Sequence, residues 1–313
     1  YLVGNPFMAH LNMKAFFERN GILENKYWYV ANDGTQNVVV TDPNDANTTW
    51  TNAGENSLVP PLRSFFVKKK DGTSGTTIAF THDMQALGGT SADAGTASGQ
   101  ALMITATNAE GKVSRAAVAY SGMASDDYQS GEDAELFLDS NLGDVPMVYT
   151  VAGTMATSIN TRTACERVPL GVYGARDEEV TLRFEGTGAF SGLALYDART
   201  GQATALREST ELRVATNDYG RYYLIGGVPT GTESIHPGND IEIYSIRPGE
   251  IVVTTTGSPL RTVCVYGVNG ALVARQSLTN QSVYRLAVPG NALYMIYAED
   301  AEGIIRNVKM RVR

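Results

Sequence analysis

The sequence predicts an all-β protein built from tandem antiparallel β-sandwiches of the jelly-roll or immunoglobulin-like kind. Short runs rich in Val, Ile, Thr, Tyr and Phe follow one another along the chain, and turn residues separate them at short intervals. The 32 glycines and 16 tyrosines among 313 residues suit many short strands and tight turns. No long helical period lies between the apolar runs, which argues against alternating helices and parallel strands.

Residues 1–90 are predicted to form a first β-sandwich with one short helix. Asn12 is the expected N-cap of this helix, Leu11, Ala15 and Phe16 share one face, and Gly21 ends it. The expected strands are Lys26–Ala31, Val38–Thr41, Ser64–Lys69 and Thr76–Phe80. Residues 41–56 are rich in Asp, Asn, Thr and Gly, which predicts a long loop.

Residues 100–228 are predicted to form a second β-sandwich. The small, polar segment 88–99 is either the boundary before it or a loop within one continuous unit. Residues 132–138 are expected to form one or two helical turns. The expected strands are Leu102–Thr107, Val113–Tyr120, Met147–Val151, Thr157–Asn160, Val168–Tyr173, Glu179–Phe184, Gly192–Asp197, Glu211–Ala215 and Tyr222–Ile225.

Residues 229–240 are rich in Pro and Gly and are predicted to link the second sandwich to a small C-terminal one. In residues 241–313 we expect an immunoglobulin-like module of seven short strands, at 241–247, 250–256, 261–267, 271–278, 282–288, 292–298 and 304–312. Asn269-Gly270 forms its central hairpin turn, because this dipeptide readily accepts positive φ.

Composition narrows the functional classes. The net charge is −8, and Lys68-Lys69-Lys70 is the only basic run, so nucleic-acid binding is disfavoured. No apolar run approaches the roughly 20 residues that span a bilayer, so no membrane span is predicted. No leader-like segment precedes Tyr1, so we expect any signal peptide to lie outside this sequence. Cys165 and Cys264 are about 100 residues apart, and two unpaired thiols are favoured over a disulfide.

Several short motifs resemble a block found in large secreted and surface proteins of Bacteroidetes. They are Leu2–Phe7 (LVGNPF), the pair Tyr27-Trp28, and the strand Pro60–Val67 (PPLRSFFV), in which Leu62 and Ser64 replace the usual small residues. Three further motifs resemble the segment that follows this block, namely Asp127–Ala134, Val168–Gly171 and Leu195–Gly201.

The C-terminal module resembles the sorting domains of the type IX secretion pathway. Val263–Val273 matches their central hairpin, Pro289–Ile296 a later strand, and Lys309 and Arg311 the terminal basic strand. The resemblance implies export from a Gram-negative bacterium, either into the medium or to the outer-membrane surface. It also implies contact with the export machinery, and a longer polypeptide whose upstream part carries the function.

Catalytic constellations are weak in this sequence. His10, His82 and His236 do not lie in a nucleophile-elbow pattern, and we expect no catalytic role for them. One acidic group could pair carboxylates for a glycoside hydrolase or bind Ca²⁺, although a polar loop that caps a short helix is favoured over both: Asp126, Asp127, Glu132, Asp133 and Glu135. A second oxygen-rich loop offers the same calcium alternative: Asp42, Asn44, Asp45 and Asn47. No cofactor is expected otherwise.

Aromatic residues give the candidate ligand site. Tyr27 and Tyr29 share one face of a strand and Trp28 takes the other, so one set is expected in the core and the other exposed. Together with Trp50, exposed rings of this kind would stack against sugars.

The sequence therefore predicts a non-enzymatic structural or adhesive region of an exported cell-surface protein that ends in a sorting or anchoring module. Its expected partners are a surface glycan or a host or cell-surface protein. The alternatives are a carbohydrate-binding module that uses Trp28, Tyr29 and Trp50, and, more remotely, a glycoside hydrolase.

Overall fold

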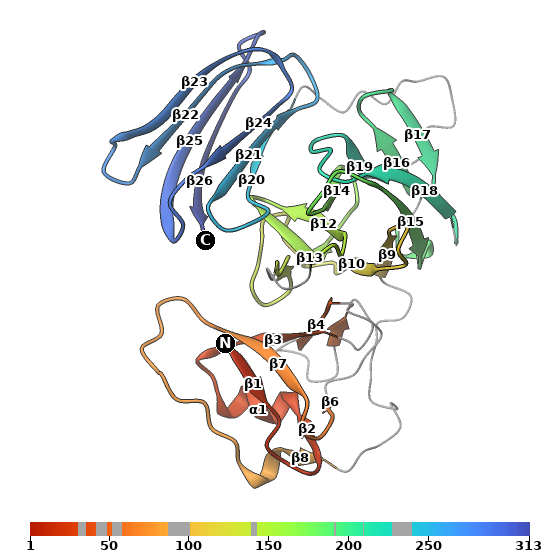
Figure 1. The fold of residues 1–313 in the computed structure, drawn as a ribbon, viewed down its shortest axis with the longest axis vertical. Coiled ribbons are helices and arrows are strands. Elements are labelled where there is room, and N and C mark those ends of the chain that lie inside the picture. The colour runs from red at the N-terminus through yellow and green to blue at the C-terminus, as the bar shows by residue number, and fades with distance from the viewer. Residues whose placement is uncertain are drawn as a thin grey trace.

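The computed structural model describes residues 1–30, 36–41, 49–51, 58–86, 101–138, 143–190, 192–208, 210–226 and 240–313. It is mostly β, as predicted, with several antiparallel sheets and one curled sheet. Figure 1 shows three units: an N-terminal one in red and orange, a middle one in yellow and green, and a C-terminal one in blue. In this view the C-terminal and middle units lie side by side above the N-terminal unit. No helix among the described residues is long and apolar enough to cross a membrane.

The N-terminal unit contains two sheets and the one α-helix in the described part of the chain. Its five-stranded sheet has the order β1 (Leu2–Gly4), β7 (Ser64–Lys69), β3 (Leu23–Val30), β4 (Gln36–Thr41) and β5 (Thr49–Thr51). A small sheet joins β6 (Leu58–Val59), β2 (His10–Asn12) and β8 (Gln85–Ala86). Phe16 and Phe17 of the helix α1 (Met13–Arg19) pack with Phe65 and Tyr27 in the core of this unit.

The predicted helix is confirmed, whereas one predicted strand is wrong. The Asn12 side chain accepts hydrogen bonds from the amides of Lys14 and Ala15, as an N-cap does. Residues 76–80 do not form a strand. The amide side chain of Asn20 instead bonds to both the N–H and the carbonyl of Ala79, at 2.8 and 2.9 Å, and so occupies the groups that a neighbouring strand would use.

The middle unit is a single eleven-stranded sheet that curls on itself, where we predicted a two-sheet sandwich. In pairing order its strands are β17 (Gln202–Ala205), β16 (Ala194–Asp197), β19 (Tyr222–Ile225), β14 (Val168–Tyr173), β12 (Met147–Ala152), β13 (Met155–Arg162), β10 (Val113–Tyr120), β9 (Ala101–Thr107), β15 (Glu179–Glu185) and β18 (Thr210–Ala215), with β11 (Ala134–Glu135) also on β13. The two ends of the sheet enclose a core that includes Ile104, Val168 and Phe184.

Strand β13 explains why the sheet is continuous. Residues 155–157 pair antiparallel with β12, and residues 159–162 pair parallel with β10. Strand β13 thus joins the part of the sheet that contains β12 to the part that contains β10. Its parallel pairing with β10 departs from the purely antiparallel pattern that we predicted. The expected helical turn at 132–138 is also wrong, because Ala134 and Glu135 form β11 and pair with the open side of β13.

The C-terminal unit has the seven strands predicted for it. One sheet contains β20 (Ile241–Tyr244), β21 (Glu250–Thr255) and β24 (Val283–Ala287), and the other β23 (Leu272–Gln281), β22 (Leu260–Gly267), β25 (Ala292–Asp300) and β26 (Ile305–Val312). Ile251, Val263 and Ile296 belong to the core between them. Gly270, at the predicted hairpin turn, has a φ of 76°. The predicted linker at 88–99 lies outside the described residues, as does the linker predicted at 229–240 except for its last residue, Asp240.

Buried side chains join the three units. Trp28 and Val40 of the N-terminal unit pack with Ala117 and Ile159 of the middle one. Tyr149 of the middle unit belongs to one cluster with Tyr244 and Val252 of the C-terminal unit. Backbone bonds of 3.0–3.1 Å between Ser245 and residues 154 and 156 add a bridge. The units are therefore packed against one another in the folded chain.

Candidate functional site

Four charged side chains form a closed ring where the N-terminal and middle units meet. Lys26 on β3 has no exposed surface, and its ammonium group lies 2.8 Å from Glu24 and 3.1 Å from Glu135. Lys68 on β7 lies 2.8 Å from Glu24 and 2.9 Å from Glu135. Positive and negative groups alternate around the ring, so each carboxylate is held between two cations.

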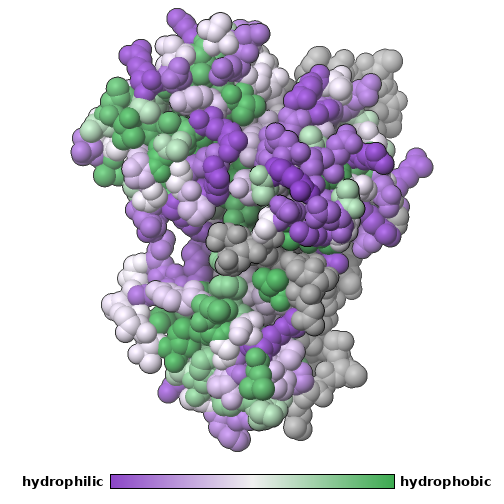
Figure 2. Space-filling model, in the orientation of Figure 1, coloured by the Kyte–Doolittle hydropathy of each residue, from purple (hydrophilic) through white to green (hydrophobic). Residues whose placement is uncertain are grey.

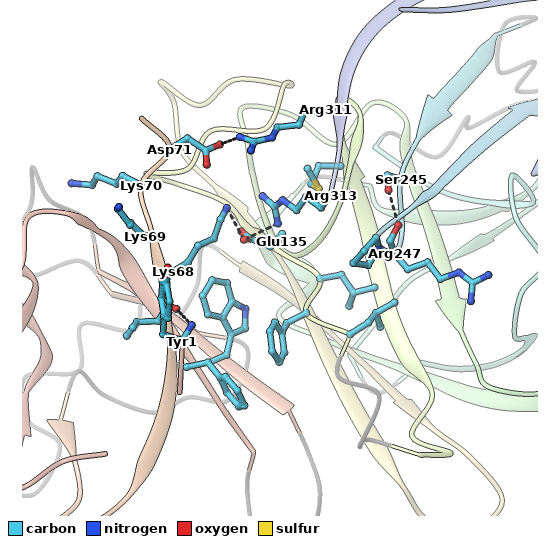
Figure 3. A pocket seen from close by; sticks show the side chains of 18 of the residues that line it. Tyr1, Lys68, Lys69, Lys70, Asp71, Glu135, Ser245, Arg247, Arg311 and Arg313 are labelled. Atoms are coloured by element: carbon cyan, nitrogen blue, oxygen red, sulfur yellow. Dashed lines mark hydrogen bonds and ion pairs between the residues drawn. The ribbon is translucent and has the colours of Figure 1, made fainter. Parts of the chain in front are cut away.

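Two further side chains complete this ionic cluster, which comprises Glu24, Lys26, Lys68, Tyr128, Glu135 and Arg313. The Tyr128 hydroxyl donates to Glu135 at 2.6 Å and accepts from Lys26 at 2.7 Å. Arg313, which follows β26 of the C-terminal unit, lies 2.8 Å from the second oxygen of Glu135. Figure 3 shows Glu135 between Lys68 and Arg313. The N-terminal and C-terminal units therefore both supply cations to one carboxylate of the middle unit.

The cluster fixes the protonation of Glu135. Burial alone would raise the pKa of this carboxyl group, but Lys26, Arg313 and Lys68 outweigh it and hold the pKa well below its ordinary value. The same burial, together with Glu135 and Glu24, raises the pKa of Tyr128 far above that of free tyrosine. Glu135 is consequently an anion and Tyr128 a neutral hydrogen-bond donor, so the pair shares no mobile proton.

Asp133, which directly precedes β11, has a supporting position. Its carboxylate oxygens accept hydrogen bonds from the backbone amides of Gln129 and Thr161, each at 2.7 Å. Burial raises the pKa of Asp133 to about 6, although these two amides oppose the shift. The carbonyl of Asp133 also accepts from Lys26 at 2.9 Å. Asp133 thus fixes the loop that carries Tyr128 and Glu135 to the cluster.

Strand alternation explains how these side chains come together. Successive residues of a strand point to opposite faces, so Glu24, Lys26 and Trp28 share one face of β3 while Tyr27 and Tyr29 share the other. Tyr27 and Tyr29 lie in the core of the N-terminal unit, and Trp28 lies in its contact with the middle unit. The charged positions of β3 are therefore buried by the middle unit, not by their own sheet.

A cavity of about 570 Å³ adjoins the cluster, at the junction of the three units. Phe66 and Phe137 contribute to its apolar wall, and their ring centroids are 4.9 Å apart. The ring centroids of Trp28 and Phe137 are 6.0 Å apart. Six basic side chains and two carboxylates line it: Lys68, Lys69, Lys70, Arg247, Arg311 and Arg313, with Asp71 and Glu135. Figure 2 shows a recess with hydrophilic residues at its edge, on the left between the N-terminal and C-terminal units.

The predicted aromatic ligand site is not exposed. Tyr27, Trp28 and Tyr29 are 2%, 3% and 3% exposed, so the expectation that one face of this strand offers open rings is wrong. The strand alternates as predicted, but the middle unit covers its second face. Trp50 lies in β5 opposite Val40, and its side chain is outside the described residues. Ligand binding by these four residues stays a prediction.

The five residues of the predicted acidic group, between Asp126 and Glu135, have different environments in the structure. Asp126 is mostly exposed and pairs with Arg162 at 2.7 Å, whereas Asp133 and Glu135 are buried in the positions given above. The backbone of the other two is fixed locally: the Asp127 amide donates to the Ser125 hydroxyl at 3.1 Å, and the Glu132 carbonyl accepts from the Thr161 hydroxyl at 2.8 Å. No cluster of three or more His, Cys, Asp or Glu residues that could hold a metal ion occurs among the described residues. The second oxygen-rich loop, from Asp42 to Asn47, lies outside them.

The histidines and cysteines are dispersed. His10 is in β2 and His82 begins the short 3-10 helix η1 (His82–Met84), while His236 lies outside the described residues. Cys165 and Cys264 are free and buried in different units, which confirms the predicted unpaired thiols. Burial raises the pKa of the Cys165 thiol to about 12, which disfavours the thiolate needed of a nucleophile.

No protein-family model matches the chain, and no curated protein is similar to it.

Sequence reasoning missed Lys26 and Lys68, the centre of the cluster. The available signal was the pair Glu24 and Lys26, two residues apart on a strand that is otherwise apolar and aromatic. Charges at alternate positions beside Trp28 indicate a face that packs on another polar surface. Their partner Glu135 could not be identified, because residues 132–138 were expected to form helical turns, whereas Glu135 lies in the strand β11.

Proposed function

We propose that this chain is a non-catalytic structural or adhesive region of an exported cell-surface protein, and that residues 241–313 are its sorting or anchoring module. The observation that carries the proposal is the C-terminal unit itself. It has seven strands in two sheets, its central hairpin turns at Asn269-Gly270, and its last strand carries exposed Lys309 and Arg311.

The packing between units supports a structural role. Tyr149 and Tyr244 lie in a shared apolar cluster, and Arg313 reaches Glu135 in the ionic cluster. Contacts of this kind suit a region that holds its parts in a fixed arrangement at a surface exposed to shear and proteases. The buried carboxylate of Glu135 is paired with cations, an arrangement that suits packing better than acid–base chemistry.

At finer detail, we assign the C-terminal unit to the immunoglobulin-like sandwiches and its lineage to the type IX sorting domains of Bacteroidetes. Location at the outer-membrane surface, or release from it, follows from this assignment. So do contact with the export machinery and adhesion to a surface glycan or a host or cell-surface protein. The resemblance of Val263–Val273 and of the basic last strand to those domains supports the assignment.

The test is surface display in a host with a type IX pathway. Deletion of residues 241–313 should retain the protein in the periplasm, measured by fractionation and by protease access on whole cells. Deletion also uncovers Tyr149 and Tyr219, so misfolding is a competing cause.

A full-length variant separates these two causes. Lys309→Glu changes an exposed residue of β26 and should reduce display while leaving the fold intact. Lys112→Glu, at a surface turn of the middle unit, is the matched control and should be displayed normally. Normal display of both the deletion and the Lys309→Glu variant would overturn the sorting assignment.

A further inference from the structure

The cavity at the junction of the three units has the size and the wall of a small-molecule site. Pockets that enclose small ligands measure roughly 300–1,000 Å³, and this one measures about 570 Å³. Phe66 and Phe137 are half-buried and line it together with Leu138 and Ile246. A ligand with a flat apolar part would cover these surfaces from water, which is the usual source of affinity in such pockets.

The charge of the lining favours an anion. Six basic residues and two acidic ones line the cavity, and Glu24 and Glu250, which pair with Lys68 and Arg247, offset only part of the difference; the Lys70 ammonium donates to the carbonyl of Gly21. Lys69 and Lys70 have no carboxylate partner among the residues that the structure describes. A recess with apolar walls and an excess of one charge concentrates the field on a ligand of opposite charge.

One cation at this cavity can exchange its partner. Arg311 lies 2.6 Å from Asp71, and their side chains are 52% and 74% exposed. An exposed pair of this kind contributes little stability, because water and salt compete with it. The Arg313 side chain is less exposed, at 34%, and pairs with the buried Glu135. Figure 3 shows the Arg311–Asp71 pair beside Arg313, with Arg247 across the cavity. The guanidinium of Arg311 can therefore leave Asp71 for an incoming anion.

We propose that this cavity binds a small organic anion, in which a carboxylate or sulfate group pairs with Arg311 and a flat apolar face lies against Phe66 and Phe137. Arg offers a planar fork of N–H donors that matches carboxylate and sulfate oxygens. Asp71 then competes with the ligand for Arg311. Uronic-acid and sulfated sugars belong to this chemical class, as do aromatic acids. The site does not depend on export, so it stands or falls separately from the proposed function.

Calorimetric titration of the whole chain at low salt tests the site. Phenyl β-glucuronide and phenyl β-glucoside differ by a carboxylate, and naphthalene-2-sulfonate and naphthalene-2-methanol differ by a sulfonate. We expect each anion to bind about tenfold more tightly than its neutral counterpart, as one charge-assisted hydrogen bond would give. Arg311→Gln should remove most of this difference. Lys309→Gln, on the same strand but outside the cavity lining, should not.

The Asp71→Asn variant separates a binding site from a structural ion pair. It frees Arg311, so anion affinity should rise severalfold, whereas a purely structural pair predicts no gain. Unfolding curves of each variant show whether the fold is kept. The proposal is overturned if neither anion binds more tightly than its neutral counterpart. It is also overturned if Lys309→Gln weakens binding as much as Arg311→Gln, or if only an acidic peptide such as hexaglutamate binds.

Discussion

Arg313 and Glu135 form an ion pair of 2.8 Å that joins the end of the C-terminal unit to the middle unit. The same carboxylate is bound by Lys26 and Lys68 from the N-terminal unit. One side chain thus connects all three units. A buried carboxylate requires such compensation, because an uncompensated charge in an apolar interior costs several kcal/mol.

Replacement of Lys26 should strongly destabilise the chain. Lys26→Met keeps the length of the side chain but leaves Glu24 and Glu135 buried with one cation fewer. We expect a loss of about 3–5 kcal/mol in the free energy of unfolding, measured by urea denaturation. Lys112→Met, which removes a partly exposed cation beside Glu110, should cost less than about 1 kcal/mol. Equal losses in the two variants would show that the ring contributes no more than a surface pair.

The stability that Glu135 contributes should disappear in acid. Its pKa is lowered by folding, from an ordinary value of 4.5, so the unfolded chain takes up the proton first as the pH falls. The contribution is therefore complete above about pH 5 and is lost progressively below 4.5. Unfolding of wild type and of Glu135→Gln, compared from pH 7 to pH 3, should show a difference that narrows below this point.

The comparison of wild type with Glu135→Gln also cancels the pH dependence of stability that Asp133 contributes. Folding raises the pKa of Asp133 to about 6, so the folded chain holds this proton more tightly than the unfolded chain. The contribution of Asp133 to stability therefore falls as the pH rises from about 4 to 6, opposite to the contribution of Glu135. Asp133 is present in both proteins, and its contribution cancels in their difference to first order. A difference that stays constant down to pH 3 would contradict the assigned charge state of Glu135.

Gly171 in β14 should not tolerate a side chain. A Cβ atom there would overlap the ring and hydroxyl of Tyr149 on the paired strand β12. Since Tyr149 is fully buried, its ring has little room to move, and we expect Gly171→Ala to cost about 1–3 kcal/mol. A Cβ atom added at Gly188 has no neighbouring atom within 4 Å, so Gly188→Ala is the control. Thermal unfolding of both variants decides the point, and equal midpoints would contradict this packing.

The three units should unfold together at neutral pH. Apolar clusters and the ionic cluster cross both boundaries, so the loss of one unit exposes buried surface on the next. Differential scanning calorimetry should give one transition whose van't Hoff and calorimetric enthalpies agree. Glu135→Arg, which places a fourth cation among three, should split or broaden it. Separate transitions in the wild type would show that the units are energetically independent.

Local pattern was sufficient to place strands and a helix cap, although not all strand partners: within the C-terminal unit β21 pairs with β24 and β22 with β25, which are not chain neighbours. All seven strands of the C-terminal unit and the helix capped by Asn12 were predictable, because a hairpin or a cap is encoded within a few residues. The parallel pairing of β10 with β13 was not predictable, because it joins residues about forty positions apart that no hairpin turn connects. For the same reason the burial of Trp28 could not be predicted: the residues that cover it, such as Ala117 and Ile159, belong to another unit.

The shared strand β13 also limits how this protein can have been assembled in evolution. A recombination point inside residues 101–225 would separate paired strands, such as β13 from β10 or β12, β15 from β9, or β19 from β14, and the products would carry unpaired backbone groups. The smallest piece that another protein could acquire with its hydrogen bonding complete is therefore the whole curled sheet. Insertions between its strands are tolerated more easily than exchange of one half, so divergent copies should differ in their loops and keep all the strands.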